Sequence, residues 1–330
     1  MDIKDFTPQN ILLIWLGKIG DFVVSTSFIR AVREKYPDAH IALMVRTPVE
    51  KIAVLVDEAD EILTFPKGYK AFRGLPKFIR QFLFRKWDLC VDLNPSYSGS
   101  SGRMTTLSFA EYKVGFANPK AAKYYNCTVP QAANDEHMMH RYDRLAELLG
   151  LKFDHRMHLS VREDDKRAAE EVLKSLGVWK HYIIFHPGNF KKEYSCWPKE
   201  NFIRLSKDIY GKYPEYQQVY IAGPGEEEEV AQMMEQLTGI AVQAPPMSLP
   251  VTAAFLSMGE LAVVNSTGTL HMAEAAGTPT LSFHKTYSYI CWRPLDTRGA
   301  ALDSGDWNTV RSLPYDLGWQ TFQDIILRLK

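Results

Sequence analysis

The stretch ILLIWLGKIGD, residues 11–21, decides the fold class, because an apolar run that reads as a buried strand passes through a glycine turn into a helical pattern. The stretch LAVVNSTGTLH, residues 261–271, repeats this pattern in the second half of the chain. Open α/β sheets bind ligands outside the carboxyl ends of their strands. Helix N-termini at that edge present free N–H groups to anions, phosphates above all. We therefore interpret the two stretches as two walls of one ligand-binding cleft.

Short apolar runs alternate with amphipathic stretches along all 330 residues, which is typical of βα units and a parallel sheet. A chain of this length is long enough to form two domains. The expected strands are 11–16, 40–45, 61–64, 89–93 and 113–115 in the first half, and 182–186, 217–222, 240–242, 261–264 and 280–283 in the second.

The boundary between the two halves is expected between Gly150 and Lys180. We divide the chain into a first domain, residues 1–165, and a second domain, residues 166–312. The remaining segment, residues 313–330, contains a helical pattern that could cross back to the first domain.

Composition excludes several classes of protein. Lys plus Arg (39) equals Asp plus Glu (39), so no overall field favours nucleic acid as a partner. Neither GxGxxG nor GxxxxGK[ST] occurs, which counts against dehydrogenases and P-loop kinases. The cysteines have no paired spacing, so we expect no disulfide framework, no metal and no cofactor, and a reducing cytoplasm fits best. They are Cys90, Cys127, Cys196 and Cys291.

One segment, residues 66–87, breaks the charge balance, because its basic residues are interleaved with aromatic ones and no acid interrupts them. One interpretation is a solvated helix whose apolar face lies on the core. The other is a surface for an anionic partner, either a phosphorylated substrate or a lipid headgroup layer. The candidate anion-binding residues are Lys67, Lys70, Arg73, Lys77 and Arg80.

Asp21 is the candidate catalytic residue of the first stretch. It lies at or near a helix start, where an aspartate can serve as an N-cap and where the helix dipole favours its charged form. An ionised carboxylate at the mouth of a cleft can also accept a proton from a hydroxyl nucleophile. Both roles stay open. Gly17 and Gly20 would let the backbone approach a ligand closely.

The turn of the second stretch carries hydroxyls, free N–H groups and a histidine. These groups are suited to a diphosphate, although a Ser/Thr capping turn without a ligand would look the same. A side chain on the first helical turn leans back toward the turn, so we expect the histidine to contact phosphate. The candidate diphosphate-binding residues are Ser266, Thr267, Gly268, Thr269 and His271, with Lys191 and Lys192 from another strand-end turn.

Two further turns follow expected strands of the second half. His186 and Gly188 lie in the first of them, and Gly223 and Glu226 in the second. A carboxylate at such a turn can bind ribose hydroxyls, but acid at a helix N-terminus is also favourable by itself. We take these four residues as candidates for binding a donor nucleoside.

The ordered set of these motifs resembles glycosyltransferase family 9, the family of lipopolysaccharide heptosyltransferases. The resemblance rests on Ile19-Gly20-Asp21, His186-Pro187-Gly188, Trp197-Pro198, Gly223-Pro224-Gly225-Glu226, Ser266-Thr267-Gly268 with His271, and Gly277-Thr278-Pro279. It spans about residues 10 to 285 in the family's order.

The resemblance implies a GT-B fold, in which two Rossmann-like domains with parallel sheets face a central cleft. It implies an N-terminal acceptor-binding domain and a C-terminal nucleotide-sugar donor domain. The implied reaction is an inverting, metal-independent transfer of heptose from ADP-heptose to the phosphorylated lipid A–core acceptor, on the cytoplasmic face of the inner membrane with peripheral attachment. The implied base is Asp21, while the Thr-Gly turn with His271 serves the diphosphate and the acid of the Gly-Pro turn contacts the ribose.

This sequence departs from the family pattern at two positions. The family usually carries a lysine two residues before Trp-Pro, where this chain has Ser195, and often an aspartate before Thr-Gly, where it has Ser266. A GT-B transferase for another nucleotide sugar and acceptor is therefore one alternative. A nucleotide-sugar epimerase of the same architecture, which would turn over the donor without an acceptor, is a second. A catalytically silent protein that binds sugar nucleotides or lipopolysaccharide is a third.

Overall fold

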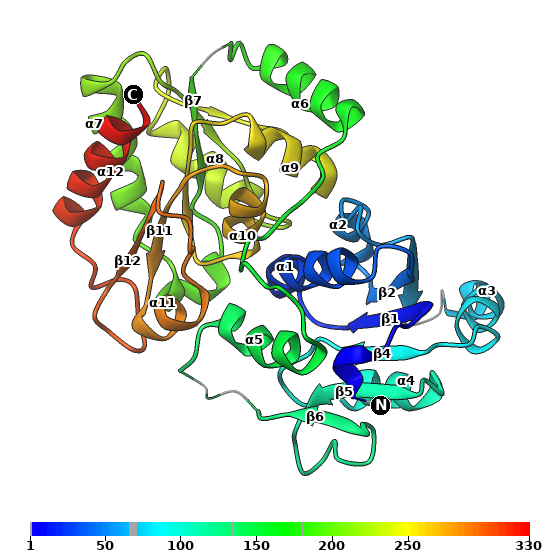
Figure 1. Cartoon of the computed structure of the whole chain (residues 1–330). Coiled ribbons are helices and arrows are strands. Elements are labelled where there is room, and N and C mark those ends of the chain that lie inside the picture. The colour runs from blue at the N-terminus through cyan, green and yellow to red at the C-terminus, as the bar shows by residue number, and fades with distance from the viewer. Residues whose placement is uncertain (1, 66–70, 132, 134, 180) are drawn as a thin grey trace. The chain divides into compact units, whose positions relative to one another are not determined.

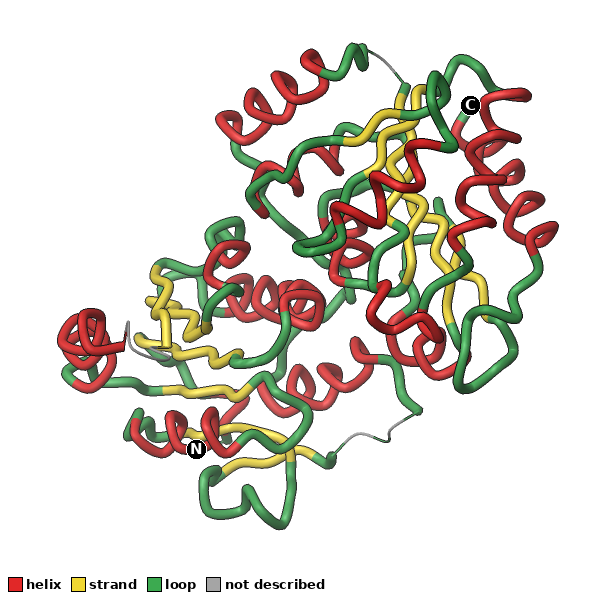
Figure 2. Tube along the Cα trace, turned by 180° about the vertical axis from the view of Figure 1, so that it is seen from behind, coloured by secondary structure: helices red, strands yellow, loops and turns green. Residues whose placement is uncertain are grey.

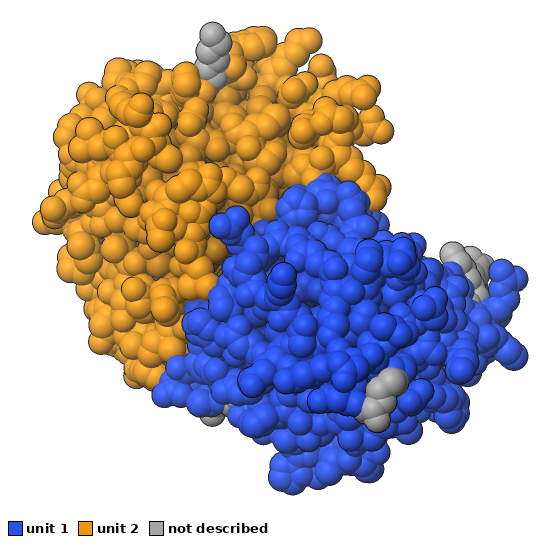
Figure 3. Space-filling view, in the orientation of Figure 1, with its two compact units in different colours: residues 1–160 blue, residues 161–330 orange. Residues whose placement is uncertain are grey.

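The computed structural model describes residues 2–65, 71–131, 133, 135–179 and 181–330. The chain divides into two compact units, Met1–Ser160 (unit 1) and Val161–Lys330 (unit 2), coloured separately in Figure 3. A division after residue 165, as the sequence suggested, would cut the first helix of unit 2, α6 (Glu163–Ser175).

Unit 1 is built on a six-stranded parallel sheet with the order β3-β2-β1-β4-β5-β6 (Figure 1). The central strand β1 pairs with β2 on one side and with β4 on the other. Its residues 11–15 are all buried, as expected for a parallel strand covered on both faces. The strands are β1 (Asn10–Trp15), β2 (His40–Arg46), β3 (Glu61–Phe65), β4 (Leu89–Asp92), β5 (Tyr112–Phe116) and β6 (Cys127–Val129).

Helices α1 to α4 connect the strands from β1 to β5, whereas η1 precedes β1 and α5 follows β6. The hydrophobic core under the sheet takes in Phe78, Phe82 and Trp87 together with side chains of β1, β2 and β4. The helices are η1 (Ile3–Asp5), α1 (Ile19–Lys35), α2 (Glu50–Ala53), α3 (Ala71–Leu83), α4 (Gly99–Leu107) and α5 (Met138–Leu149).

Unit 2 repeats the architecture with the order β12-β11-β10-β7-β8-β9, again all parallel. Seen from behind in Figure 2, its strands form one layer with helices on either side. The strands are β7 (Tyr182–His186), β8 (Gln217–Tyr220), β9 (Val242–Gln243), β10 (Leu261–Asn265), β11 (Thr280–His284) and β12 (Ala300–Asp303). The two parallel sheets confirm the predicted α/β fold class.

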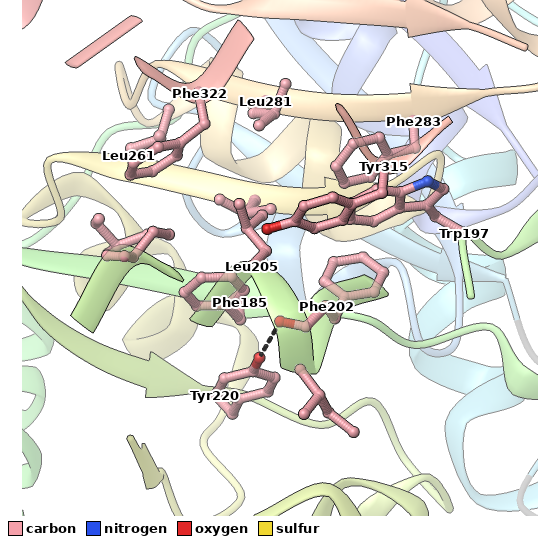
Figure 4. Packing of buried hydrophobic residues seen from close by; sticks show 14 of the residues in the cluster. Phe185, Trp197, Phe202, Leu205, Tyr220, Leu261, Leu281, Phe283, Tyr315 and Phe322 are labelled. Atoms are coloured by element: carbon pink, nitrogen blue, oxygen red, sulfur yellow. Dashed lines mark hydrogen bonds between the residues drawn. The ribbon is translucent and has the colours of Figure 1, made fainter. Parts of the chain in front are cut away.

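The core of unit 2 is centred on Trp197, whose indole stacks on Phe283 at 4.1 Å between ring centroids and lies parallel to Tyr315 at 6.0 Å (Figure 4). Tyr315 opens the last helix, α12, so this helix packs in the core of unit 2. The helices are α6 (Glu163–Ser175), η2 (Phe190–Ser195), α7 (Lys199–Lys212), α8 (Glu227–Glu235), α9 (Leu249–Ser257), α10 (Gly268–Ala275), α11 (Thr286–Trp292) and α12 (Tyr315–Leu329).

Among the described residues, no helix combines the length and the apolar character needed to cross a bilayer.

Candidate functional site

In unit 1 the chain reverses its direction of winding between β1 and β4, which are neighbours in the sheet. A reversal of this kind opens a crevice at the carboxyl ends of the two strands, and ligands of open α/β sheets bind there. The segments that leave this edge are residues 16–18, which lead into α1, and residues 93–98, which lead into α4.

Asp21 lies on the first turn of α1, directly after the turn that follows β1. The N-cap of α1 is Lys18, so Asp21 does not cap the helix, and the capping role considered from the sequence is wrong. Burial raises the pKa of the half-buried Asp21 carboxyl, while the positive charges of Lys18 and Arg141 act in the opposite direction. The carboxyl is therefore a stronger proton acceptor than an ordinary surface aspartate.

Gly17 has a structural reason to be glycine. The indole of Trp15 folds back over the turn and donates its Nε1–H to the carbonyl of Lys18 at 3.0 Å. A Cβ on Gly17 would lie 2.4 Å from the indole ring. Gly20 is the second residue of α1. The close approach of a ligand to either glycine stays a prediction.

Asp92, the last residue of β4, is a buried carboxylate that the sequence analysis missed. It accepts hydrogen bonds from the hydroxyl of Ser101 at 2.5 Å, the side-chain amide of Asn94 at 2.6 Å and the hydroxyl of Tyr125 at 2.7 Å. Burial raises the pKa of Asp92, and these hydrogen bonds oppose the rise. The carboxylate thus fixes the segment between β4 and α4. The sequence signal for Asp92 was an acidic residue at the carboxyl end of an apolar strand.

In unit 2 the corresponding edge is formed by β7, β8 and β10. His186 ends β7 and is buried, and its Nδ1 lies 3.4 Å from the hydroxyl of Thr267 at the start of α10. Burial lowers the pKa of His186, although the nearby Glu226 carboxylate raises it. The structure thus brings together three of the residues proposed from the sequence: His186, Glu226 and Thr267.

Glu226 lies just before α8 and reaches back to the turn after β7. Its carboxylate accepts the backbone N–H of Asn189 at 2.5 Å and that of Gly223 at 3.2 Å. A Cβ on Gly188 would lie 2.1 Å from this carboxylate, and one on Gly223 2.6 Å. The two glycines therefore make room for Glu226. Because a carboxylate oxygen can accept more than one hydrogen bond, Glu226 retains capacity for a ligand hydroxyl.

Asn265, the last residue of β10, was also missed as a positioning residue. It is buried, and its side-chain oxygen accepts the backbone N–H of Trp197 at 2.9 Å. Its side-chain amide donates to the carbonyl of Pro187 at 2.9 Å. Through these two bonds, Asn265 holds both ends of the segment 187–197, which follows β7, against the end of β10.

Ser266 and Thr267 lead from β10 into α10, whose N-cap is Thr267. The Thr267 hydroxyl makes no capping bond to the helix, so the simple Ser/Thr cap considered from the sequence is not what the structure shows. The first N–H groups of a helix lack partners within the helix and are available to an anion. Ser266, Gly268 and Thr269 are half-buried, whereas His271 is buried with its ring 5.8 Å from that of Trp292.

Lys191 and Lys192 are exposed on η2, the short helix after β7. A further cation, Lys285, follows β11, the neighbour of β10. Its ammonium lies 4.9 Å from the ring centre of Tyr194 on η2. The side chain of Lys285 therefore extends from the carboxyl end of β11 to η2, the helix that follows β7. The sequence signal for it was a lysine placed immediately after a buried strand.

The basic segment is only partly described. Lys67 and Lys70 lie outside the described residues, and so do the side chains of Arg73 and Lys77, whose backbones belong to α3. Arg80 is exposed on the same helix. Phe78 and Phe82 of α3 pack in the core, as in the first of the two interpretations. Binding of an acceptor by this segment stays a prediction.

Two α/β units, each with a parallel six-stranded sheet, are the architecture of the GT-B fold. The family model for glycosyltransferase family 9 (heptosyltransferase) matches residues 76–311. The chain therefore belongs to this family and is a glycosyltransferase, which confirms the resemblance seen in the sequence.

Similar proteins extend the match to nearly the whole chain. Lipopolysaccharide heptosyltransferase 3 of Escherichia coli K12 is 22% identical over 295 residues, which cover 83% of this chain and 82% of that protein. The glycosyl transferase family 9 structure from Veillonella parvula DSM 2008 superposes with a TM-score of 0.83 at 18% identity and covers 99% of both chains. The structure of E. coli heptosyltransferase WaaC with ADP gives a TM-score of 0.71 at 17% identity and covers 97% of this chain and 99% of that one.

Proposed function

We propose that this glycosyltransferase moves heptose from ADP-heptose to the lipid A–core region of lipopolysaccharide, with inversion at the anomeric carbon. Membership of family 9 supports heptosyl transfer. The E. coli K12 relative is named as a lipopolysaccharide heptosyltransferase, and the E. coli WaaC structure contains ADP. The name of the relative favours lipopolysaccharide as the acceptor, and the bound ADP favours an ADP-sugar over other sugar nucleotides as the donor.

The observation that carries the proposal is the arrangement of Glu226, His186 and Thr267 at one edge of the unit 2 sheet. A carboxylate held by two backbone N–H groups is suited to ribose hydroxyls. A neutral imidazole next to a threonine hydroxyl and the start of α10 is suited to phosphate oxygens. Lys285 adds a positive charge at the same edge.

The proposed reaction is a single displacement. The Asp21 carboxylate takes the proton of an acceptor hydroxyl, whose oxygen then attacks the anomeric carbon of the donor. The bond from that carbon to the diphosphate oxygen breaks, and ADP leaves with the electron pair. The N–H groups of α10, His271 and Lys285 stabilise its negative charge. Fixed donors aimed at developing charge are usually the largest catalytic contribution, and removal of one is expected to lower turnover about 100- to 1,000-fold.

We assign the acceptor phosphates to the basic segment, residues 66–87, and propose that the protein works at the cytoplasmic face of the inner membrane. Reversal of two charges, Lys77→Glu with Arg80→Glu, is expected to raise the KM for the acceptor and to leave donor affinity unchanged. The matched control reverses Arg167 and Lys174 on α6, which changes the net charge equally. Equal loss of donor and acceptor affinity would contradict this assignment.

The direct test is product formation from ADP-heptose and a heptose-deficient lipopolysaccharide acceptor, with UDP- and GDP-sugars as competitors. We expect consumption of ADP-heptose only when the acceptor is present. Turnover of another sugar nucleotide would favour the alternative transferase. Binding of the donor without product would identify a silent binding protein. A thermal shift with ADP, UDP and GDP reports the base preference separately, because a ligand specific for the folded state raises its melting temperature.

A further inference from the structure

A cluster of two histidines and an aspartate lies in unit 1 and has no part in the proposed reaction. His140 and Asp143 are three residues apart on α5, so their side chains share one helix face. His155 belongs to the segment that follows this helix. The Nδ1 atom of His140 lies 3.0 Å from one oxygen of Asp143, and the Nε2 atom of His155 lies 2.5 Å from the other.

The chemistry of this cluster is that of a metal site. Among the described residues, the ion-pair partners of Asp143 are these two imidazoles and no lysine or arginine. One potential ligand atom from each of the three residues lies within 4.8 Å of the others. Two atoms that bind one ion at about 2.0–2.1 Å can be at most about 4 Å apart, so small side-chain rotations suffice. All three side chains are partly exposed, which leaves room for water as a further ligand.

The backbone at His155 restricts which residue can replace it in a test. His155 has a φ of 60°, in the left-handed region that a residue with a Cβ rarely adopts. Such a conformation persists where surrounding contacts hold it. Here the left-handed residue is the one whose imidazole reaches Asp143.

We propose that His140, Asp143 and His155 bind a divalent transition-metal ion, Zn²⁺ in the first instance, with water completing the coordination. Two imidazoles and one carboxylate suit Zn²⁺, whereas Mg²⁺ and Ca²⁺ prefer an all-oxygen set. The ion would clamp the segment after α5 to that helix and stabilise unit 1. The sequence expectation of no metal rested on the spacing of the four cysteines, which says nothing about histidines and an aspartate that the fold brings together.

The test is calorimetric titration of the full chain, purified with chelator, with Zn²⁺ alone. We expect saturable binding of one ion per chain and a rise in melting temperature. Loss of outer-sphere partners alone weakens metal binding by about 10- to 100-fold, so each ligand variant is expected to lose at least about 100-fold in affinity. The variants are His140→Gln, Asp143→Asn and His155→Asn. Asparagine tolerates the left-handed backbone, so His155→Asn removes the ligand and spares the fold.

His181→Asn is the matched control, because His181 also has a left-handed φ, of 45°, and its Nδ1 atom lies 2.8 Å from the carboxylate of Glu260 in a pair without a third ligand among the described residues. This control should bind Zn²⁺ as the unmodified protein does. A cobalt-loaded sample separates the cluster from the cysteines, because thiolate ligands would add a strong near-ultraviolet charge-transfer band. No saturable binding, equal loss in the control, or a thiolate band would each overturn the proposal. None of these readouts depends on transferase activity.

Discussion

The carboxylate of Glu226 accepts the backbone N–H of Asn189 at 2.5 Å, and this bond joins the turn after β8 to the turn after β7. Gly188 and Gly223 leave room for this contact, because a Cβ on Gly188 would lie 2.1 Å from the carboxylate and one on Gly223 2.6 Å. The bond shapes the edge of unit 2 to which we assign the donor nucleotide.

Gly188→Ala should therefore displace Glu226. A hydrogen bond to a charged group contributes about 1.5–3 kcal/mol, so we expect a loss of that order in the free energy of unfolding and about tenfold weaker ADP binding. Denaturant titration and calorimetry measure the two effects. Gly211→Ala on α7 is the control, because a Cβ there meets no atom within 4 Å. A Gly188→Ala variant with unchanged stability and ADP affinity would show that Glu226 does not shape the site.

Lys285→Met should weaken the binding of ADP but not of adenosine, because the methionine keeps the apolar stem near Tyr194 and removes only the charge. Charge-assisted hydrogen bonds are roughly twice as strong as neutral ones, so the expected loss is about 10- to 100-fold for ADP. Lys207→Met, on the exposed face of α7, is the matched control. A parallel loss of adenosine binding would point to a packing role for Lys285.

Glu274 of α10 should make the stability of unit 2 depend on pH. Burial raises the pKa of this carboxyl to about 7, against 4.5 for an ordinary glutamate. The folded state then holds a proton that the unfolded state has lost, so the free energy of unfolding falls as pH rises from about 4.5 to about 7.

Glu274→Gln should abolish this fall, because glutamine does not titrate. It keeps the oxygen that accepts the N–H of Leu295. The free energy of unfolding of the variant, relative to that of the unmodified protein, should rise by about 2 kcal/mol between pH 4.5 and pH 8, after allowance for the solvent that reaches this side chain. Chemical denaturation at several pH values measures the gain, and Glu235→Gln, exposed on α8, serves as control. A difference that does not change with pH would contradict the account.

The sequence predicted the central strands well because they are apolar on both faces. The expected strand 182–186 coincides with β7, whereas the edge strands β6 and β12 were missed. Both missed strands are only partly buried, so they lack the continuous apolar run that marks a central strand.

At the candidate site, the sequence identified residues that follow strands but not the contacts between them. His186, Glu226 and Thr267 could be proposed separately because each lies at a strand end. Their contacts depend on the strand order, which places β10 beside β7 and which no local pattern contains. Asn265 was missed for the same reason, because its partners Trp197 and Pro187 are distant in sequence. Asp92 has the nearby partners Asn94 and Ser101, and only its bond from Tyr125 spans a long stretch of chain.

The central claim is that Asp21 accepts the proton of the acceptor hydroxyl. Because burial raises the pKa of Asp21, kcat/KM should fall with decreasing pH at a higher pH than for an ordinary aspartate, whose pKa is 3.8. A pH profile in which this acidic limb is missing would argue for another base.

The most direct measurement compares kcat and donor affinity for Asp21→Asn with those of the unmodified enzyme, using ADP-heptose and a lipopolysaccharide acceptor. Asparagine keeps the shape of the side chain and removes its ability to take a proton. The account predicts that kcat falls by about 100-fold or more while the Kd for ADP stays the same, because we assign the donor site to unit 2. Turnover close to that of the unmodified enzyme would contradict it.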